Sequence, residues 1–147
     1  MLPFSIALRP GEPVVDQVVY AVTRAVVSGQ LRAGDRFPSV RTLSQELKVN
    51  PNTAQRIVAL LVEAGLLAVE PGIGTVVTAH QPGAGASTAA ARRADLTELR
   101  NRLAEPLVVE ARRIGVSLAD LVEMVRAQWK SLDAAPRAAP RGAEPRE

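Results

Sequence analysis

Residues 49–61 read VNPNTAQRIVALL, and this stretch decides the fold of the chain. It carries the start signals of a helix, because Asn50 can cap the first turn and Pro51 fits the first helical position without losing a hydrogen bond. At about 100° per residue, one side of this helix is apolar and consists of Ala54, Ile57, Val58 and Leu61. The other side is polar near its N-terminal end, where it presents Asn52, Thr53, Gln55 and Arg56. The stretch predicts a helix that packs by one side, and its neighbours indicate what the polar side is for.

Two helices are expected ahead of this one. Residues 14–30 repeat valine at helical spacing and carry Gly29 as an end signal; the repeated positions are Val15, Val18, Val19, Val22 and Val26. Residues 39–48 form a shorter helix, which Ser39 can cap after Pro38 has stopped any earlier helix. Only a short turn separates this helix from the one that starts at Pro51, and that spacing is typical of a helix-turn-helix.

A β-hairpin is expected after the third helix. Gly65 can end that helix, and two β-branched runs follow it, LLAVE at 66–70 and TVVTA at 75–79. The PGIG between the runs is typical of a tight turn. Residues 1–79 are therefore expected to form one domain, in which a short extended segment at 3–9 and a turn-rich connection at 31–38 accompany three helices and a hairpin.

The remaining residues predict a smaller helical unit. A Gly/Pro/Ala-rich linker is expected over 80–93, and two helices are expected within 94–132. Pro106 should kink or divide the first of them, and Ser117 can cap the second together with Asp120. The tail at 133–147 repeats Pro-Arg with balanced charge, so it is expected to be disordered.

Composition narrows the classes of function. The chain has 147 residues and no cysteine, which excludes disulfides, thiol nucleophiles and cysteine-ligated metals. The one histidine, His80, lies in the linker without a carboxylate cluster around it, so no metal site is expected. The sequence has no Ser/His/Asp arrangement, and PGIGT lacks the lysine and the following helix of a phosphate-binding loop. The chain is therefore not expected to be an enzyme, and no cofactor is expected.

Charge and hydropathy predict a protein outside the membrane whose arginines make specific contacts with phosphate or bases. Sixteen of the eighteen basic residues are arginine, which suits bidentate contacts to phosphate and guanine. The net charge of +3 is too small for general adhesion to nucleic acid. No apolar run reaches the length of a membrane span, and residues 1–13 lack the features of a signal peptide. A cytoplasmic protein without a membrane partner is expected.

The polar side of the third helix fits the recognition of DNA. In helix-turn-helix proteins the N-terminal end of the second helix of the motif contacts base edges. Asn and Gln side chains can bond adenine, and Arg can bond guanine. Any amphipathic helix turns polar residues to solvent. Without its neighbours, this helix would be explained best as an ordinary solvated surface. Arg36 and Arg41 ahead of the helix, and the slim hairpin tip from Gly72 to Gly74, favour DNA instead.

The span from Pro13 to Val77 resembles the DNA-binding domain of GntR-family regulators, which is a winged helix. The resemblance rests on Gln17 and on three segments in the order of the family, GQLRAGDRFPSVRTLSQEL (29–47), VNPNTAQR (49–56) and EAGLLAVEPGIGTVV (63–77). It implies a bacterial transcription regulator that binds a palindromic operator in double-stranded DNA as a homodimer, and we expect a repressor.

The resemblance and the residue chemistry together give the expected DNA contacts. They are Arg36, Ser39, Arg41, Asn50, Pro51, Asn52, Thr53, Gln55, Arg56, Gly72 and Gly74. Many family members carry a basic or aromatic residue in the wing, whereas this chain has Pro71 and Ile73 there. A backbone contact by the wing, at Gly72, is therefore expected in place of a side-chain contact.

The C-terminal unit looks like that of the YtrA subfamily, whose members carry a short two-helix dimerisation unit. An isolated pair of short helices cannot bury its apolar stripes well, but pairing with a second copy would bury them. The residues expected at this interface are Leu96, Leu99, Leu103, Leu107, Leu121, Val122, Val125 and Trp129. The alternative is that they pack back onto the winged helix of the same chain.

The sequence thus predicts a mainly α fold with a small β-hairpin, as a winged helix-turn-helix domain followed by a two-helix dimerisation unit. The alternative function is a winged helix that docks onto another protein without binding an operator. Salt discriminates between the two, because phosphate contacts release counterions and weaken steeply with ionic strength. The C-terminal unit is too small to enclose much of an effector pocket, so control is expected in the interface or in expression level.

Overall fold

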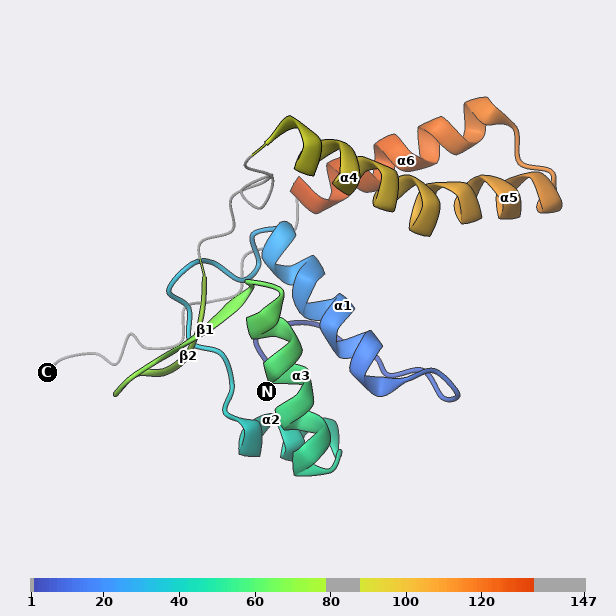
Figure 1. Cartoon of the computed structure of the whole chain (residues 1–147). Helices are drawn as coiled ribbons and strands as arrows, with labels where there is room; N and C mark the ends of the chain where they lie inside the picture. The colour runs from blue at the N-terminus through green and yellow to red at the C-terminus, as the bar shows by residue number, and fades with distance from the viewer. Residues whose placement is uncertain (1, 79–87, 134–147) are drawn as a thin grey trace, which may run out of the picture. The chain divides into compact units, whose positions relative to one another are not determined.

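Three helices and a β-hairpin form the first unit in the computed structural model of the chain, which describes residues 2–78 and 88–133 (Figure 1). The elements are α1 (Val14–Val27), α2 (Val40–Leu47), α3 (Pro51–Glu63), β1 (Leu67–Glu70) and β2 (Gly74–Val77). Their order and approximate bounds are those predicted. Four further elements, α4, η1, α5 and α6, make up a second unit, which is described separately below.

Local caps set the bounds of the helices in the first unit. The Ser39 hydroxyl accepts a hydrogen bond from the backbone nitrogen of Thr42 at 3.1 Å, and so begins α2. Asn50 begins α3 in the same way, and Pro51 is its first residue. Beyond the end of α3, Gly65 has φ +77°, a left-handed conformation that favours glycine. These three predicted end signals are confirmed.

The core of the first unit is entirely apolar, and α3 lies at its centre. α3 contacts α1, α2 and β1, and its apolar side is buried at Ala54, Ile57, Val58 and Leu61 (Figure 1). α1 buries Val18, Val22 and Val26 of the predicted valine series, whereas Val15 and Val19 are half-buried at its margin. Among the described residues no polar or charged side chain is buried, so apolar burial supplies the driving force.

The hairpin gains a third short segment that the sequence did not predict. β1 and β2 are antiparallel, with Leu67 opposite Val77 and Glu70 opposite Gly74. The connection before α2 then pairs with β2, because the nitrogen of Phe37 donates to the oxygen of Thr75 at 2.8 Å and Arg36 forms a bridge with Val76. The end of the turn-rich connection is thus extended and attached to the sheet.

The second unit contains α4 (Ala89–Leu99), η1 (Arg100–Ala104), α5 (Glu105–Ile114) and α6 (Leu118–Asp133). The first helix begins at Ala89, inside the segment expected as linker, because the hydroxyl of Thr88 accepts from the nitrogen of Ala91 at 3.1 Å and alanine favours the helix. The helix that was expected to start at residue 94 is therefore longer than predicted.

His80 and nearly all of the expected tail lie outside the described residues.

Pro106 is accommodated by a widened turn. α4, η1 and α5 follow one another without a break, and η1 is a π-helical turn that ends at Ala104, two residues before Pro106. The nitrogen of Glu105 bonds back to the oxygen of Arg100, five residues earlier. Proline lacks an N–H and clashes with the preceding turn, and a π-turn is a common way to relieve both. The predicted division of the helix therefore takes the form of a π-turn.

The two long helical stretches of this unit are joined by a sharp turn. Gly115 has φ +82° after α5, and the hydroxyl of Ser117 accepts from the nitrogen of Asp120 at 3.1 Å to begin α6, as predicted. Within residues 88–133 only Ala111 and Leu121 are buried. In the described part of the chain no helix is both long and apolar enough to span a bilayer.

Candidate nucleic-acid interface

The polar side of α3 is open to solvent along its first two turns. Asn50, Pro51, Asn52, Gln55 and Arg56 are exposed, and Thr53 is half-buried. The opposite side is held in the core, where Ala54, Ile57 and Leu61 are 0% exposed. α3 is thus fixed rigidly by one side while the other presents amide, hydroxyl and guanidinium groups. Ala59 continues this side as a small exposed residue, so a large surface can approach the helix closely.

Asn50 and Ser39 have backbone partners that limit what they can offer to a ligand. The Asn50 Oδ1 accepts from the backbone nitrogen of Asn52 at 2.8 Å, which leaves its NH₂ group as the free donor. The Ser39 hydroxyl oxygen also lies 3.0 Å from the hydroxyl of Thr42. Both residues therefore begin helices, and any contact with DNA would be made in addition to that role.

The turn between α2 and α3 contains a residue that sequence reasoning missed. Lys48 has φ +54° and ψ +47°, a left-handed conformation that is uncommon for a residue other than glycine, asparagine or aspartate. Ser44 holds this turn, because its hydroxyl donates to the oxygen of Val49 at 2.7 Å and its own carbonyl accepts from the nitrogen of Val49 at 3.1 Å. The turn places an exposed lysine two residues before Asn50.

The hairpin tip is shaped by glycine. The nitrogen of Ile73 donates to the oxygen of Glu70 at 3.1 Å, and between them Gly72 has φ +78°. Proline at the second position and glycine at the third, with this φ, are the features of a type II turn. A β-carbon built on Gly72 would meet no atom within 4 Å, so the glycine is required by backbone conformation and leaves the tip open for close approach. Ile73 is 49% exposed.

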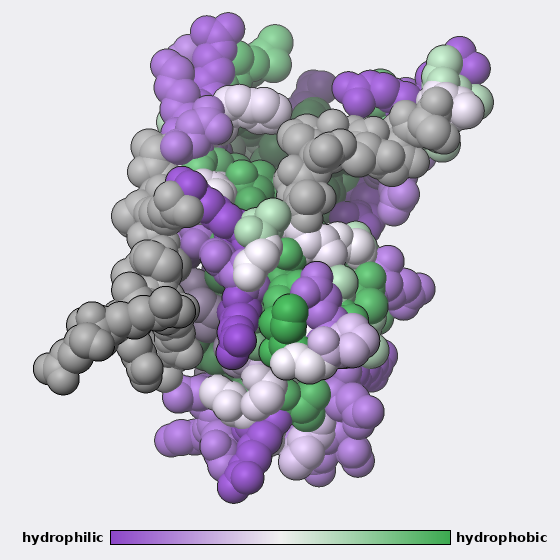
Figure 2. Space-filling model, turned by 90° about the vertical axis from the view of Figure 1, so that its left-hand side faces the viewer, coloured by the Kyte–Doolittle hydropathy of each residue, from purple (hydrophilic) through white to green (hydrophobic). Residues whose placement is uncertain are grey.

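Four cations lie on α3 and on the segments that lead into it. Arg36, Arg41, Lys48 and Arg56 are all exposed. None of them takes part in the ion pairs found within residues 2–78 and 88–133. In Figure 2 the lower end of the view, where Figure 1 places α2 and the start of α3, carries many hydrophilic side chains with some apolar ones between them. These groups can bind phosphate oxygens and base edges, whereas the described residues hold no cluster of metal ligands.

A second candidate surface lies on the apolar sides of α4, α5 and α6. Leu96, Leu99 and Leu103 are each more than half exposed, and Trp129 is 74% exposed. Leu107, Val122 and Val125 line a mostly apolar groove of about 260 Å³ between α5 and α6, with Arg126 at its margin, and Leu121 closes its base with 8% exposure. Leu121 is therefore already packed within one chain, while the other seven residues expected at an interface remain accessible.

Ion pairs on this unit lie on its solvent side. The guanidinium of Arg113 binds the carboxylate of Glu110 through two hydrogen bonds, of 2.8 Å and 2.5 Å. This pairing lowers the pKa of Glu110 and raises the pKa of Arg113. Both side chains are well exposed, so the pair is screened by solvent and contributes little to stability.

Comparison with known proteins agrees with this geometry. The family model described as "Bacterial regulatory proteins, gntR family" matches residues 14–77, which are α1 to β2. The chain is 26% identical over 118 residues to the HTH-type transcriptional repressor YtrA of Bacillus subtilis, covering 80% of this chain and 85% of the relative.

Two further similarities extend the comparison. The chain is 33% identical over 85 residues to the HTH-type transcriptional regulator Rv1152 of Mycobacterium tuberculosis, covering 58% of this chain and 70% of that protein. Its fold is similar to the crystal structure titled as a transcriptional antiterminator from Listeria monocytogenes, with a TM-score of 0.72 at 21% identity, over 92% of this chain and 96% of the other. The predicted winged-helix fold is confirmed, and the chain belongs to the GntR family of DNA-binding transcription regulators, which are not enzymes.

Proposed function

We propose that the protein is a repressor that binds a palindromic operator as a homodimer, with α3 of each copy in the major groove. The observation that carries this proposal is the division of α3 into a buried side and an exposed polar side next to four exposed cations. A helix in the major groove needs a rigid attachment behind it and hydrogen-bonding side chains in front, and α3 has both.

The residues of this surface divide into two roles by chemistry. Asn52, Gln55 and Arg56 project from the first two turns of α3, and we assign to them the contacts with base edges. Arg36, Arg41 and Lys48 lie in loops or at a helix start around α3, which suits contacts with phosphates that fix register. The type II turn at Gly72 is assigned a backbone contact beside the groove.

Homodimerisation is supported by how little the second unit buries alone. Two buried residues do not make a core for the 46 residues from 88 to 133, whereas twelve large apolar residues are exposed along its helices, among them the seven expected at the interface. A second copy that packs against the α5–α6 groove would cover Leu107, Val122 and Val125, which line it. Two-fold symmetry of such a dimer presents two equivalent α3 helices, so the operator should be a palindrome whose half-sites are one helical turn of DNA, about 34–36 Å, or a multiple of it apart.

Repression is supported by the similarity to YtrA of Bacillus subtilis, a protein named as a repressor, over most of both chains. A bound dimer of this kind blocks a promoter by occupying it. A transcription assay from a promoter that contains the selected site, with increasing amounts of the protein, tests this directly. Rising transcript levels would contradict repression.

The DNA contacts are tested with an operator selected from random-sequence duplexes. Arg56→Ala should weaken binding of that operator by roughly 1–3 kcal/mol and relax the preference at one base position. Arg41→Ala should weaken binding to operator and random duplex alike, and lower the slope of log affinity against log salt by about 1. Arg24→Ala is the control, because Arg24 is exposed on α1 outside this surface.

Salt separates this proposal from the docking alternative. Operator binding by exposed cations should weaken steeply as ionic strength rises. A chain whose binding to every selected duplex is as weak as its binding to random DNA, but which forms a salt-insensitive complex with a protein, would instead be a docking module.

A further inference from the structure

The N-terminal segment 2–9 crosses α1 and is fixed at both ends. At its start, Phe4 is 4% exposed and stacks on Phe37, with ring centroids 5.9 Å apart and ring planes inclined by 2°. Leu2 and Ile6 pack against the same core. Centroid distances of 4.5–7 Å with offset rings are favourable for aromatic pairs. This end therefore has a specific attachment to the core.

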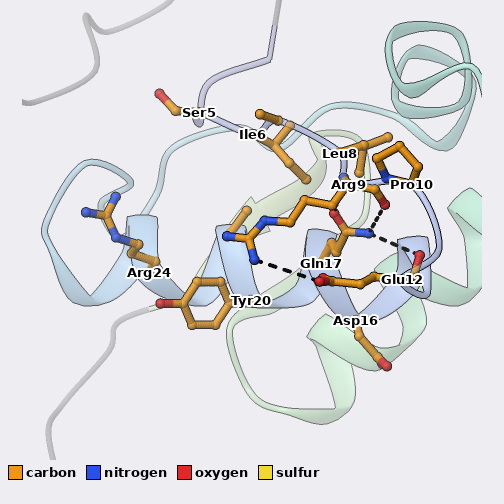
Figure 3. A pocket seen from close by; sticks show the side chains of 12 residues that line it. Ser5, Ile6, Leu8, Arg9, Pro10, Glu12, Asp16, Gln17, Tyr20 and Arg24 are labelled. Atoms are coloured by element: carbon orange, nitrogen blue, oxygen red, sulfur yellow. Dashed lines mark hydrogen bonds and ion pairs between the residues drawn. The ribbon is translucent and has the colours of Figure 1, made fainter. Parts of the chain in front are cut away.

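The other end is held by one side chain of α1. The Gln17 Oε1 accepts from the backbone nitrogen of Arg9 at 2.7 Å, while its Nε2 donates to the oxygens of Arg9 and Glu12, both at 3.1 Å (Figure 3). The amide of Gln17 thus pairs with both backbone groups of Arg9, as a neighbouring strand would. A primary amide is the side-chain group that can donate and accept at once in this way.

Between these two ends only Ile6 packs against the core, and Ser5, Ala7 and Leu8 do not. A hollow of about 760 Å³ lies beneath the segment, bordered by Tyr20 and Arg24 of α1 (Figure 3). Ser5, Ala7 and Leu8 in this part of the segment are exposed. The position of the segment therefore depends on Phe4, on the partial packing of Ile6 and on Gln17, and much less on Ser5, Ala7 and Leu8.

The partner of Phe4 leads directly into the expected phosphate-binding turn. Phe37 is fixed on one side by its hydrogen bond to Thr75 of β2 and on the other by the ring of Phe4. Ser39, which caps α2, follows two residues later, and Arg41 lies in the first turn of α2. A displacement of Phe37 would move the start of α2 relative to α3.

We propose that residues 2–9 act as a strap that holds the Phe37–Thr42 turn and thereby positions Arg41 for DNA, with Phe4 and Gln17 as positioning residues that do not touch DNA. The link to DNA rests on the proposed contact of Arg41. That the strap holds the turn is a separate claim, which rests on the Phe4–Phe37 stack and the Gln17 hydrogen bonds.

Two variants of the full-length chain test the strap, each with a conservative change. Gln17→Met keeps the length and helix preference of the side chain but removes all three hydrogen bonds. Phe4→Leu keeps an apolar side chain in the core but removes the ring stack. Tyr20→Ala is the matched control, because Tyr20 is 70% exposed on the same helix and borders the same hollow.

Amide hydrogen exchange without DNA gives the first readout. Both variants should speed exchange at Phe37 and Thr42 by about tenfold, while Ile57 and Val58 in the centre of α3 keep their protection. Tyr20→Ala should leave all four amides unchanged. A uniform increase that includes α3 would mean that the strap only adds to overall stability, and it would overturn the proposal.

A double-mutant cycle on the selected operator gives the second readout. Gln17→Met should lower affinity by about tenfold, but Gln17→Met combined with Arg41→Ala should bind as Arg41→Ala alone does, because both act through the same contact. Affinity losses that multiply would overturn positioning through Arg41. If Arg41→Ala binds as the wild type does, the proposed contact of Arg41 is wrong, and amide exchange alone then decides whether the strap holds the turn.

Discussion

The side-chain oxygen of Asn50 accepts a hydrogen bond from the backbone nitrogen of Asn52 at 2.8 Å. Asn50 therefore caps α3 and also lies at its N-terminal end, which is proposed to contact DNA. A loss of DNA binding in an Asn50 variant has two explanations, a frayed helix or a lost contact. Variants at this position have to separate the two.

Asn50→Ala and Asn50→Asp separate them. Alanine removes the cap and should lower the free energy of unfolding by about 1 kcal/mol, whereas aspartate caps as well as asparagine does. Aspartate should still weaken operator binding, because it replaces the free NH₂ donor with a negative charge close to phosphates. Urea unfolding and fluorescence anisotropy measure the two effects. Wild-type affinity in Asn50→Asp would assign Asn50 to capping alone.

Lys48→Gly should make the protein more stable and a weaker binder of DNA. The left-handed backbone at position 48 strains a lysine but not a glycine, so we expect the free energy of unfolding to rise by roughly 0.5–1 kcal/mol. The lost cation should reduce affinity for random duplex and lower the salt slope by about 1. Lys48→Asn also lacks the charge but does not add the backbone freedom of glycine, so it separates the loss of charge from that freedom. Unchanged binding in both variants would remove Lys48 from the phosphate contacts.

Gly72 in the type II turn tests whether the wing approaches DNA. Gly72→Ala should destabilise the fold by about 1 kcal/mol, because φ is +78° there. Gly72→Asn should be less strained, since asparagine adopts this conformation more readily, but its side chain would obstruct a close backbone contact. Thermal unfolding and operator affinity are compared for both. If Gly72→Asn binds as the wild type does, the glycine serves the turn only.

Leu107→Glu and Val125→Glu should convert the proposed dimer into monomers, because each replaces an apolar side chain of the groove, 41% and 46% exposed in one chain, with a charged one. Val109→Glu is the control: Val109 is 60% exposed on α5 but does not line the groove between α5 and α6. Light scattering after size exclusion gives the mass of each variant. A monomeric wild type, or dimers in all three variants, would contradict the proposed interface.

The elements that sequence reasoning predicted well are those with local causes. The bounds of α2 and α3 follow from Ser39, Asn50 and Pro51, which act within one helical turn of themselves. The buried side of α3 follows from periodicity alone, and all four residues predicted for it are buried. The composition of residues 66–79 was likewise sufficient to predict the hairpin.

The features that were missed depend on partners far apart in the sequence. Phe4 and Phe37 meet through tertiary packing, and Arg36 bridges to Val76, so no local pattern marks either pair. The left-handed Lys48 was missed because lysine rarely adopts this conformation, and only the bonds of Ser44 across the turn explain it. Gln17 was noticed through family resemblance, but no sequence pattern predicts its hydrogen bonds to the backbone of Arg9.

The sparse core of residues 88–133 has a consequence for gene dosage. A unit that buries only Ala111 and Leu121 within one chain gains most of its order from the proposed second copy. Folding and association are then one equilibrium, and the amount of assembled protein rises with the square of the free chain at low copy number. Under this proposal the number of molecules per cell is itself a signal, and a modest change in synthesis rate would produce a larger change in promoter occupancy.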